Sequence, residues 1–157
     1  MKRVFSKYFI AIIVFAVTVG FSACSSDDDD DNLPDPAKGG IYKVEIAFSG
    51  DYQNCFKQAS ITGIATEGTS SVDIKDGSGK VLTTTSLTDN NYTFTANNTF
   101  TLSQSCSSLI LGISVSSYVD NKPATIKVKV HKDTKVIYEV EETVLATKSF
   151  QLSKILE

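Results

Sequence analysis

The chain has 157 residues, of which 41% are hydrophobic and 21% charged, and this is the size and composition of one globular domain. Its formal net charge is −3, and it contains no Trp, one His (His131) and one Arg (Arg3). This composition offers no basic surface for nucleic acid and few of the side chains from which catalytic or phosphate sites are built. We therefore expect no nucleic-acid partner, no catalytic residues, no cofactor and no enzyme activity.

Residues 1–23 have the organisation of a secretory signal peptide. Lys2, Arg3 and Lys7 form a basic start, residues 9–19 are almost wholly apolar, and the small residues Ser22 and Ala23 end the segment. The apolar run is shorter than the roughly 20 residues that a membrane-spanning helix needs. The pattern therefore favours a signal peptide over a transmembrane anchor.

The end of this segment, Phe21-Ser22-Ala23-Cys24, resembles the lipobox of bacterial lipoproteins. Ser22, Ala23 and Cys24 match the lipobox, whereas Phe21 stands where Leu is usual. In lipoproteins of this kind the chain is cut before the Cys, which then carries the lipid. The resemblance implies lipidation of Cys24 and membrane attachment through acyl chains. The alternative is a plain secreted protein with a free Cys24.

Ser25, Ser26 and the acidic run Asp27–Asp31 follow Cys24 directly. Ser after the Cys resembles lipoproteins sent to the outer membrane, and the acidic run resembles the surface-export signal of Bacteroidetes lipoproteins. The resemblance covers residues 1–31 and implies an exported, lipid-anchored, surface-exposed protein of the outer membrane. Five consecutive carboxylates also form a solvated, self-repelling spacer. They lack the ligand alternation of a calcium site, so no metal is expected there.

Residues 24–40 form a tether between the lipidated Cys and the folded part. Pro34 and Pro36 stiffen it, and Gly39-Gly40 restores freedom just before the first apolar run. The predicted organisation is a signal peptide over 1–23, an acidic tether over 24–40 and a β-domain over 41–157. The acidity lies in the tether, so the β-domain is nearly neutral.

The β-domain alternates apolar and polar residues with the period of two that half-buried strands show. The alternation is clearest over 42–48, 126–131 and 136–141, and further strands are expected near 57–65, 71–75, 80–85, 91–96, 99–104, 108–117 and 147–155. Many short strands in a domain of this size predict an all-β fold, a single antiparallel β-sandwich. A small closed β-barrel is the alternative.

Register arguments predict how the strands around residues 133–134 pair. A two-residue loop at Asp133-Thr134 would place Glu139 on the core face, so we predict a three-residue loop. That loop pairs Val128 with Tyr138 or Val140 and sets Glu139 opposite a lysine.

A second hairpin is expected around Asn97-Asn98, with four residues sharing one face: Tyr92, Phe94, Phe100 and Leu102. The segment Lys75–Lys80 lacks the alternating acidic ligands of a calcium loop, and we expect a simple turn there. His131 lies near the end of its strand, where we expect a solvated residue rather than a catalytic base.

Cys55 and Cys106 lie in the predicted exported domain, where disulfides persist. A bridge between them would stabilise the fold by about 4 kcal/mol in the chain-entropy model. The alternative is two buried thiols on different strands. Neither Cys has a His nearby in sequence that would make it a nucleophile.

Tyr52 and Tyr118 lie in polar, loop-like sequence and are the candidate partner-binding residues. An exposed Tyr can stack on a sugar or a protein partner. A Tyr whose ring packs on the edge of the core exposes only its hydroxyl to solvent. The sequence thus predicts a non-enzymatic surface lipoprotein whose β-sandwich binds an unknown glycan or protein partner. The alternative is a small β-barrel carrier or inhibitor with an apolar cavity.

Overall fold

The structure, a computed structural model, describes residues 39–66 and 72–157. The predicted signal peptide, Cys24, the acidic run Asp27–Asp31 and most of the tether lie outside the described residues and remain predictions. The described chain contains one 3-10 turn and nine strands: β1 (Tyr42–Gly50), η1 (Tyr52–Asn54), β2 (Cys55–Ala65), β3 (Ile74–Asp76), β4 (Ser86–Thr88), β5 (Asn97–Leu102), β6 (Cys106–Ser117), β7 (Ala124–Lys132), β8 (Lys135–Val144) and β9 (Phe150–Leu156).

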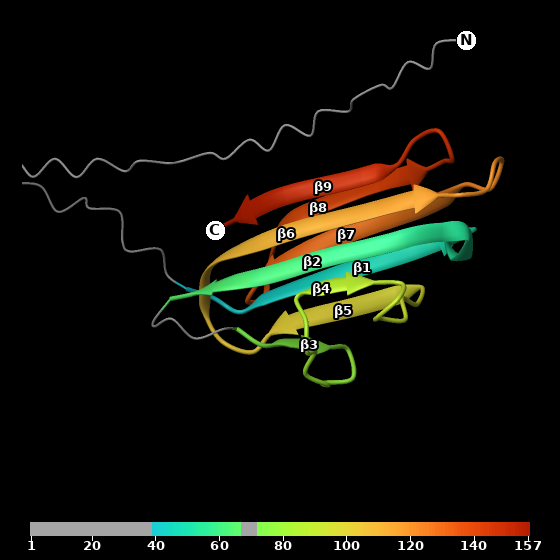
Figure 1. Ribbon diagram of the computed structural model, residues 1–157. Helices are drawn as coiled ribbons and strands as arrows, with labels where there is room; N and C mark the ends of the chain where they lie inside the picture. The colour runs from blue at the N-terminus through green and yellow to red at the C-terminus, as the bar shows by residue number, and fades with distance from the viewer. Residues whose placement is uncertain (1–38, 67–71) are drawn as a thin grey trace, which may run out of the picture. The chain divides into compact units, whose positions relative to one another are not determined.

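The strands form two antiparallel sheets that pack face to face (Figure 1). One sheet has the order β3-β5-β1-β7-β8 and the other the order β4-β2-β6-β9. The predicted all-β sandwich is therefore confirmed, and the closed-barrel alternative is not the architecture of the described chain. No helix in the described ranges is long and apolar enough to cross a membrane.

The core lies between the sheets and follows from the alternation of each strand. Val44 and Ile46 of β1 face Leu111 and Ile113 of β6 from the opposite layer, and each of the four is at most 4% exposed. Burial of such side chains stabilises the fold by about 1.5–3 kcal/mol each. Tyr42 is also fully buried, and its hydroxyl donates to the carbonyls of Ser107 and Leu156.

The β7–β8 hairpin has the predicted side-chain pairing but not the predicted loop. Val128 lies opposite Val140 and Lys129 opposite Glu139, as expected. The connection is nevertheless the two-residue loop at Asp133-Thr134 that the register argument excluded. A β-bulge after Val130 adds one residue to β8 and returns the apolar side chains to the core face.

The hairpin expected around Asn97-Asn98 is wrong, because residues 91–96 form no strand and β5 pairs with β1 and β3. The buried Asn98 side chain donates to the Thr95 and Ile46 carbonyls and accepts from the Thr95 amide. A residue of β5 therefore satisfies backbone groups of the preceding loop. Tyr92 packs against Phe100, with ring centroids 5.4 Å apart, and Phe94 and Leu102 lie in the same core cluster, but Tyr92 and Phe94 reach it from a loop and not from a strand face. Residues 80–85 also form no strand beyond a single bridge.

Cys55 and Cys106 are free thiols, and the possible disulfide between them is not formed. Cys55 begins β2, whereas Cys106 lies opposite Ala65 at the far end of the same strand. Eleven residues of β2 separate these positions by roughly 30 Å, and a disulfide needs Cα atoms within about 7 Å. Both thiols are buried, and burial raises the pKa of each.

Candidate functional site

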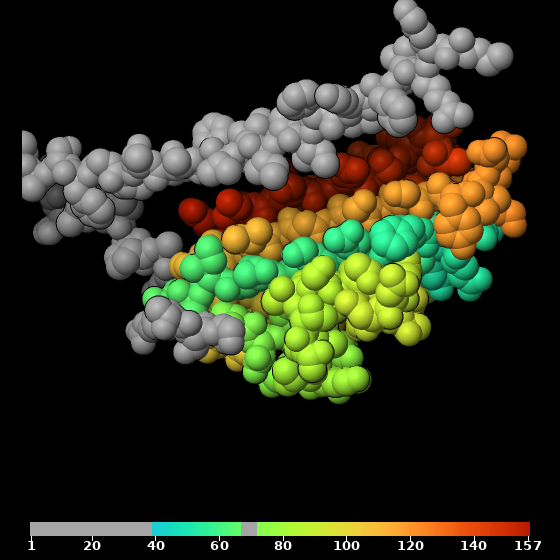
Figure 2. Space-filling model, in the orientation of Figure 1, coloured from blue at the N-terminus to red at the C-terminus, as the bar shows by residue number. Residues whose placement is uncertain are grey.

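The outer surface of the β4-β2-β6-β9 sheet carries only uncharged side chains among the described residues, and we call it the neutral face. Figure 2 views the molecule from this side. The alternation of each strand and the pairing between strands place these residues there. They are Ser86 and Thr88 of β4, Phe56, Gln58, Ser60, Thr62 and Ile64 of β2, Ile110, Gly112, Ser114 and Ser116 of β6, and Gln151, Ser153 and Ile155 of β9.

A shallow groove of about 520 Å³ crosses the middle of the neutral face. Its polar lining consists of Gln58, Ser60, Ser114, Gln151 and Ser153, and Gly112 lies among them. Gly112 keeps the floor low because it has no side chain, although a Cβ there would make only ordinary contact with Ser60. The lining offers hydroxyl and amide groups that both donate and accept hydrogen bonds.

Apolar side chains flank this groove toward both ends of the sheet. Phe56 is 45% exposed, Ile110 41% and Ile155 68%, and each points outward from its strand. The neutral face therefore combines uncharged hydrogen-bonding groups with exposed hydrocarbon. Such a surface fits a ligand that is rich in hydroxyl groups and carries no net charge.

The outer surface of the other sheet is charged, and the lysines and glutamates of β1, β7 and β8 form ion pairs there. Lys127 lies 2.9 Å from Glu139 and 3.2 Å from Glu141, and Lys43 lies 2.7 Å from Glu45. The hydrogen bond from Lys127 holds the pKa of Glu139 below its ordinary value and raises the pKa of Lys127. Because the two signs alternate, this sheet presents no patch of one charge that would attract an ionic ligand.

His131 lies on the charged sheet and is less solvated than the sequence predicted. Its side chain is 16% exposed, and its Nε2 lies 3.2 Å from a carboxylate oxygen of Glu45. Glu45 itself has a lowered pKa, chiefly because Lys43 donates to it. His131 Nε2 is buried and makes no hydrogen bond among the described residues, so the ring lies against the Lys43–Glu45 ion pair and not in solvent.

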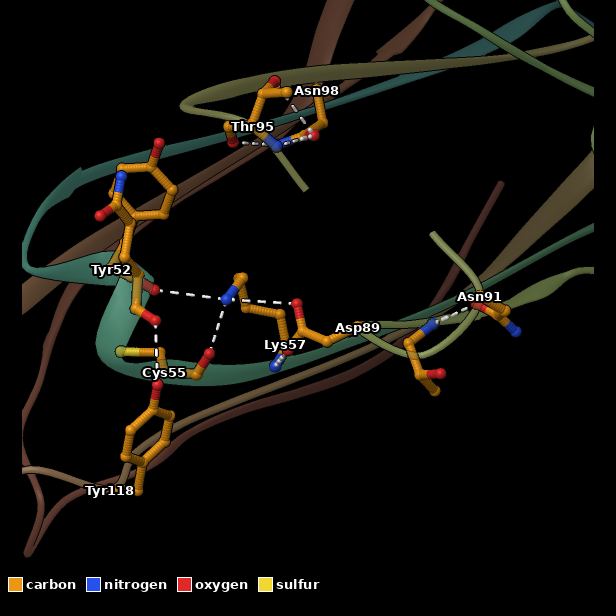
Figure 3. Close-up of polar contacts among 10 residues, drawn as sticks. Tyr52, Cys55, Lys57, Asp89, Asn91, Thr95, Asn98 and Tyr118 are labelled. Atoms are coloured by element: carbon orange, nitrogen blue, oxygen red, sulfur yellow. Dashed lines mark hydrogen bonds and ion pairs between the residues drawn. The ribbon is translucent and has the colours of Figure 1, made fainter. Parts of the chain in front are cut away.

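The two tyrosines predicted to bind a partner have different environments. The ring of Tyr52 is half-buried and stacks on Phe48, with centroids 5.7 Å apart and planes 14° apart. Tyr118 is 68% exposed, and its hydroxyl donates to the Gln53 carbonyl over 3.1 Å. Figure 3 shows the two rings on opposite sides of the β1–β2 connection. The structure therefore does not bring them together, and Tyr118 alone is presented to solvent.

Tyr118 extends the neutral face by one position. It follows Ser114 and Ser116 in the outward alternation of β6, and its amide donates to the Asn54 carbonyl. Phe56 lies directly opposite Ser116 in the neighbouring strand. The end of the neutral face near the β1–β2 connection thus carries two aromatic side chains, Phe56 on β2 and Tyr118 directly after β6.

Lys57 is a site residue that the sequence reasoning missed. Its side chain is 7% exposed, and its ammonium lies 2.5 Å from the Cys55 carbonyl, 3.3 Å from the Tyr52 carbonyl and 3.2 Å from Asp89 Oδ1 (Figure 3). Asp89 Oδ2 also accepts the Lys57 amide over 2.6 Å. The signal was available, because Lys57 shares the inward parity of Cys55 and Ala59.

The described chain is thus a two-sheet β-sandwich with one uncharged and one charge-paired outer surface. Residues 5–153 match the family described as PLCC: PLAT/LH2 and C2-like Ca²⁺-binding lipoprotein, and the chain belongs to this family. No curated protein matches the chain.

Solved structures from Bacteroides and Parabacteroides share the fold. A DUF4425 domain of unknown function from Bacteroides vulgatus is 22% identical with a TM-score of 0.61, and the match covers 74% of this chain and 96% of that one. A DUF4425 family protein from Bacteroides ovatus is 19% identical with a TM-score of 0.58, covering 75% and 93%. The calcium-bound form of a Parabacteroides distasonis protein is 22% identical with a TM-score of 0.61, covering 84% and 100%.

These matches agree with the predicted type of protein, a lipoprotein of the Bacteroidetes kind. The signal peptide, the lipobox and the surface-export signal remain predictions.

Proposed function

We propose that this chain is a non-enzymatic, lipid-anchored binding protein of the outer membrane whose neutral face binds an uncharged glycan outside the cell. The family supports the lipoprotein part of this proposal. The observation that carries the binding part is the neutral face itself, which lacks any charge over four strands while the opposite sheet is densely charged. Such a difference between two solvent-facing sheets favours a ligand for which ionic contacts are useless.

A neutral glycan matches the groove chemically. Its hydroxyls can exchange hydrogen bonds with Gln58, Ser114 and Gln151, and its C–H faces can pack on Ile110 or Phe56. Tyr118 lies at the end of the same face and offers a further exposed ring. A protein partner remains an outcome of the test rather than the proposal.

The test is affinity electrophoresis of the full chain in gels that contain either a neutral polysaccharide, such as galactomannan or β-glucan, or anionic polygalacturonate. We expect retardation by at least one neutral polysaccharide. Ser114→Glu places a charge in the groove and should weaken this retardation about tenfold, which corresponds to about 1.4 kcal/mol. The matched control is Thr101→Glu, which adds the same charge to the other sheet between Lys43 and Lys75 and should bind as the wild type does.

Three results would contradict the proposal. The first is retardation by polygalacturonate alone, and the second is equal retardation of Ser114→Glu and the wild type. The third is the absence of any polysaccharide binding together with saturable, Ser114-dependent binding of a purified surface protein. The third result would move the proposal to a protein partner on the same face.

Calcium does not fit the described residues, although the family description names it and the Parabacteroides neighbour is calcium-bound. Within residues 39–66 and 72–157, no three His, Cys, Asp or Glu side chains gather in a way that could hold a metal ion. Asp76 Oδ1 already accepts hydrogen bonds from Ser78 N, Ser78 Oγ and Lys80 N in the predicted turn. Asp89 faces the Lys57 ammonium. Calcium therefore forms no part of the proposed function.

A further inference from the structure

We propose that the Lys57 ammonium occupies a cation position at the loop end of the sandwich and fixes the loops there without a divalent ion. The position is defined by three oxygen atoms, the carbonyls of Tyr52 and Cys55 and the Asp89 carboxylate, which we call the oxygen cradle. This inference concerns the loop end and is independent of the neutral-face proposal.

The cradle has the chemistry of a site for a hard cation. Backbone carbonyl and carboxylate oxygens are the ligands that calcium takes from proteins. Here the three oxygens converge on one buried point, and a single ammonium with its three N–H donors fills that point. A calcium ion cannot share the cradle, because the ammonium occupies the space and like charges at such short range repel.

Lys57 reaches the cradle from inside the sandwich rather than from solvent. It follows Cys55 and precedes Ala59 on the inward side of β2. Its stem therefore lies along the core, and its ammonium reaches back to the carbonyls of Tyr52 and Cys55 at the beginning of the strand. An ammonium in such a place is stable only when acceptors surround it. The Lys57 ammonium is therefore a fixed positive charge inside the fold.

The ammonium also joins two connections that are distant in the chain. Tyr52 belongs to the β1–β2 connection and Cys55 begins β2, whereas Asp89 follows β4. Asp89 holds both the ammonium and the amide of Lys57, each with a different carboxylate oxygen. Removal of the positive charge should consequently loosen both connections while the sheets remain paired.

The experiment measures the Tm of the full chain as wild type, Lys57→Met and Lys122→Met. Each protein is unfolded by heat in three solutions: EDTA, about 5 mM CaCl₂, and NaCl at the same ionic strength as the CaCl₂. We expect the wild-type Tm to be the same in all three solutions. Lys57→Met should lose roughly 10 °C or more in EDTA, because the Asp89 carboxylate loses its ion partner and the Tyr52 and Cys55 carbonyls lose their charged donor. Calcium, but not NaCl, should restore part of this loss, since the cradle is then open to a cation. Lys122 is an exposed lysine at the same end, so Lys122→Met should match the wild type throughout.

Residue-specific NMR of the same samples locates the effect. In the wild type, calcium should leave the amide signals of residues 52–57 and 89 unchanged, and in Lys57→Met it should shift them. Saturable calcium shifts of these signals in the wild type would overturn the proposal. So would a Lys57→Met Tm close to that of the wild type, or a Tm loss that calcium does not reverse any better than NaCl does.

If Lys57→Met does not fold, Lys57→Gln carries the same expectation in a milder form, because its amide group can still donate to a carbonyl. A Lys57→Gln protein whose Tm shows no response to calcium would then overturn the proposal.

Discussion

Two inward positions of β2 carry no apolar side chain, and they are occupied by Lys57 and Gly63. A different physical reason explains each residue. Lys57 lies at the beginning of the strand, where two carbonyls and Asp89 accept its ammonium. Gly63 lies near the end, where the opposite sheet approaches closely. A Cβ built on Gly63 would lie 2.6 Å from Leu102 Cδ1 and 2.7 Å from Cys106 Sγ. Close packing leaves no room for even one methyl group there.

Gly63→Ala should therefore destabilise the domain. We expect a loss of about 1–3 kcal/mol in the free energy of unfolding, because Leu102 and Cys106 must move to admit the methyl group. Urea unfolding followed by far-ultraviolet circular dichroism measures the loss. Gly112→Ala is the matched control, since its Cβ would meet only Ser60 at 3.7 Å, and it should change stability little. Equal stability of the two variants would contradict this account of Gly63.

At the scale of elements, the β7–β8 hairpin shows how far sequence patterns predict the fold. The alternation of Val128 and Val140 with Lys129 and Glu139 predicted their pairing, because each strand has one buried and one solvated side. The same pattern could not reveal the β-bulge after Val130. The extra residue of the bulge allows a two-residue loop while the apolar side chains of both strands stay on the core face. Pairing was predictable here and loop length was not.

The segments 80–85 and 91–96 failed as strands for a different reason. In residues 80–85 the apolar Val81 and Leu82 are adjacent, and single backbone hydrogen bonds, such as Leu82 N to Ile74 O and Ile61 N to Thr85 O, join the segment to its neighbours. Residues 91–96 do alternate, but a polar side chain bonds part of their backbone in place of a neighbouring strand. In residues 91–96, Asn98 bonds both the amide and the carbonyl of Thr95. The pattern of apolar and polar residues does not show that a side chain three residues away will bond these backbone groups. The neutral face was likewise beyond prediction, because it exists only once β2, β6 and β9 are known to be neighbours.

The charge-paired sheet should make stability depend on pH. Glu139 and Glu45 have pKa values below the ordinary 4.5, because Lys127 and Lys43 donate to them. A carboxylate with a lowered pKa in the folded state stabilises the fold above its ordinary pKa, and this stabilisation is lost as the pH falls through the lowered value. We expect the urea concentration at the unfolding midpoint to decrease as the pH is lowered beneath about 4.5. The decrease should be less steep in Glu139→Gln, which lacks one of these carboxylates. It should also be less steep in high salt, because these groups are solvated and salt screens their interactions. Identical pH profiles for Glu139→Gln and the wild type would contradict this expectation.

At the scale of the whole molecule, the protein combines a sandwich that has two unlike outer surfaces with an anchor predicted at Cys24. The sandwich contributes the neutral face, and the predicted acidic tether would hold it away from the membrane. The anchor is implied by the resemblance of residues 1–31 to Bacteroidetes lipoproteins, and the binding surface is proposed from the paired strands, so the two parts rest on separate observations. Together, the predicted anchor and the proposed binding surface imply that the neutral face binds its ligand at the cell surface.

The most direct test of that claim is the binding of a fluorescent neutral polysaccharide, chosen from the gel experiment, to intact cells that produce the full chain. Cells with the wild type should bind it, cells with Ser114→Glu should bind about tenfold less, and cells with Thr101→Glu should bind as much as the wild type. Cys24→Ala should release the protein from the membrane fraction and abolish cell binding. Undiminished binding by Ser114→Glu cells, or a Cys24→Ala protein that still fractionates with the outer membrane and binds, would contradict the account.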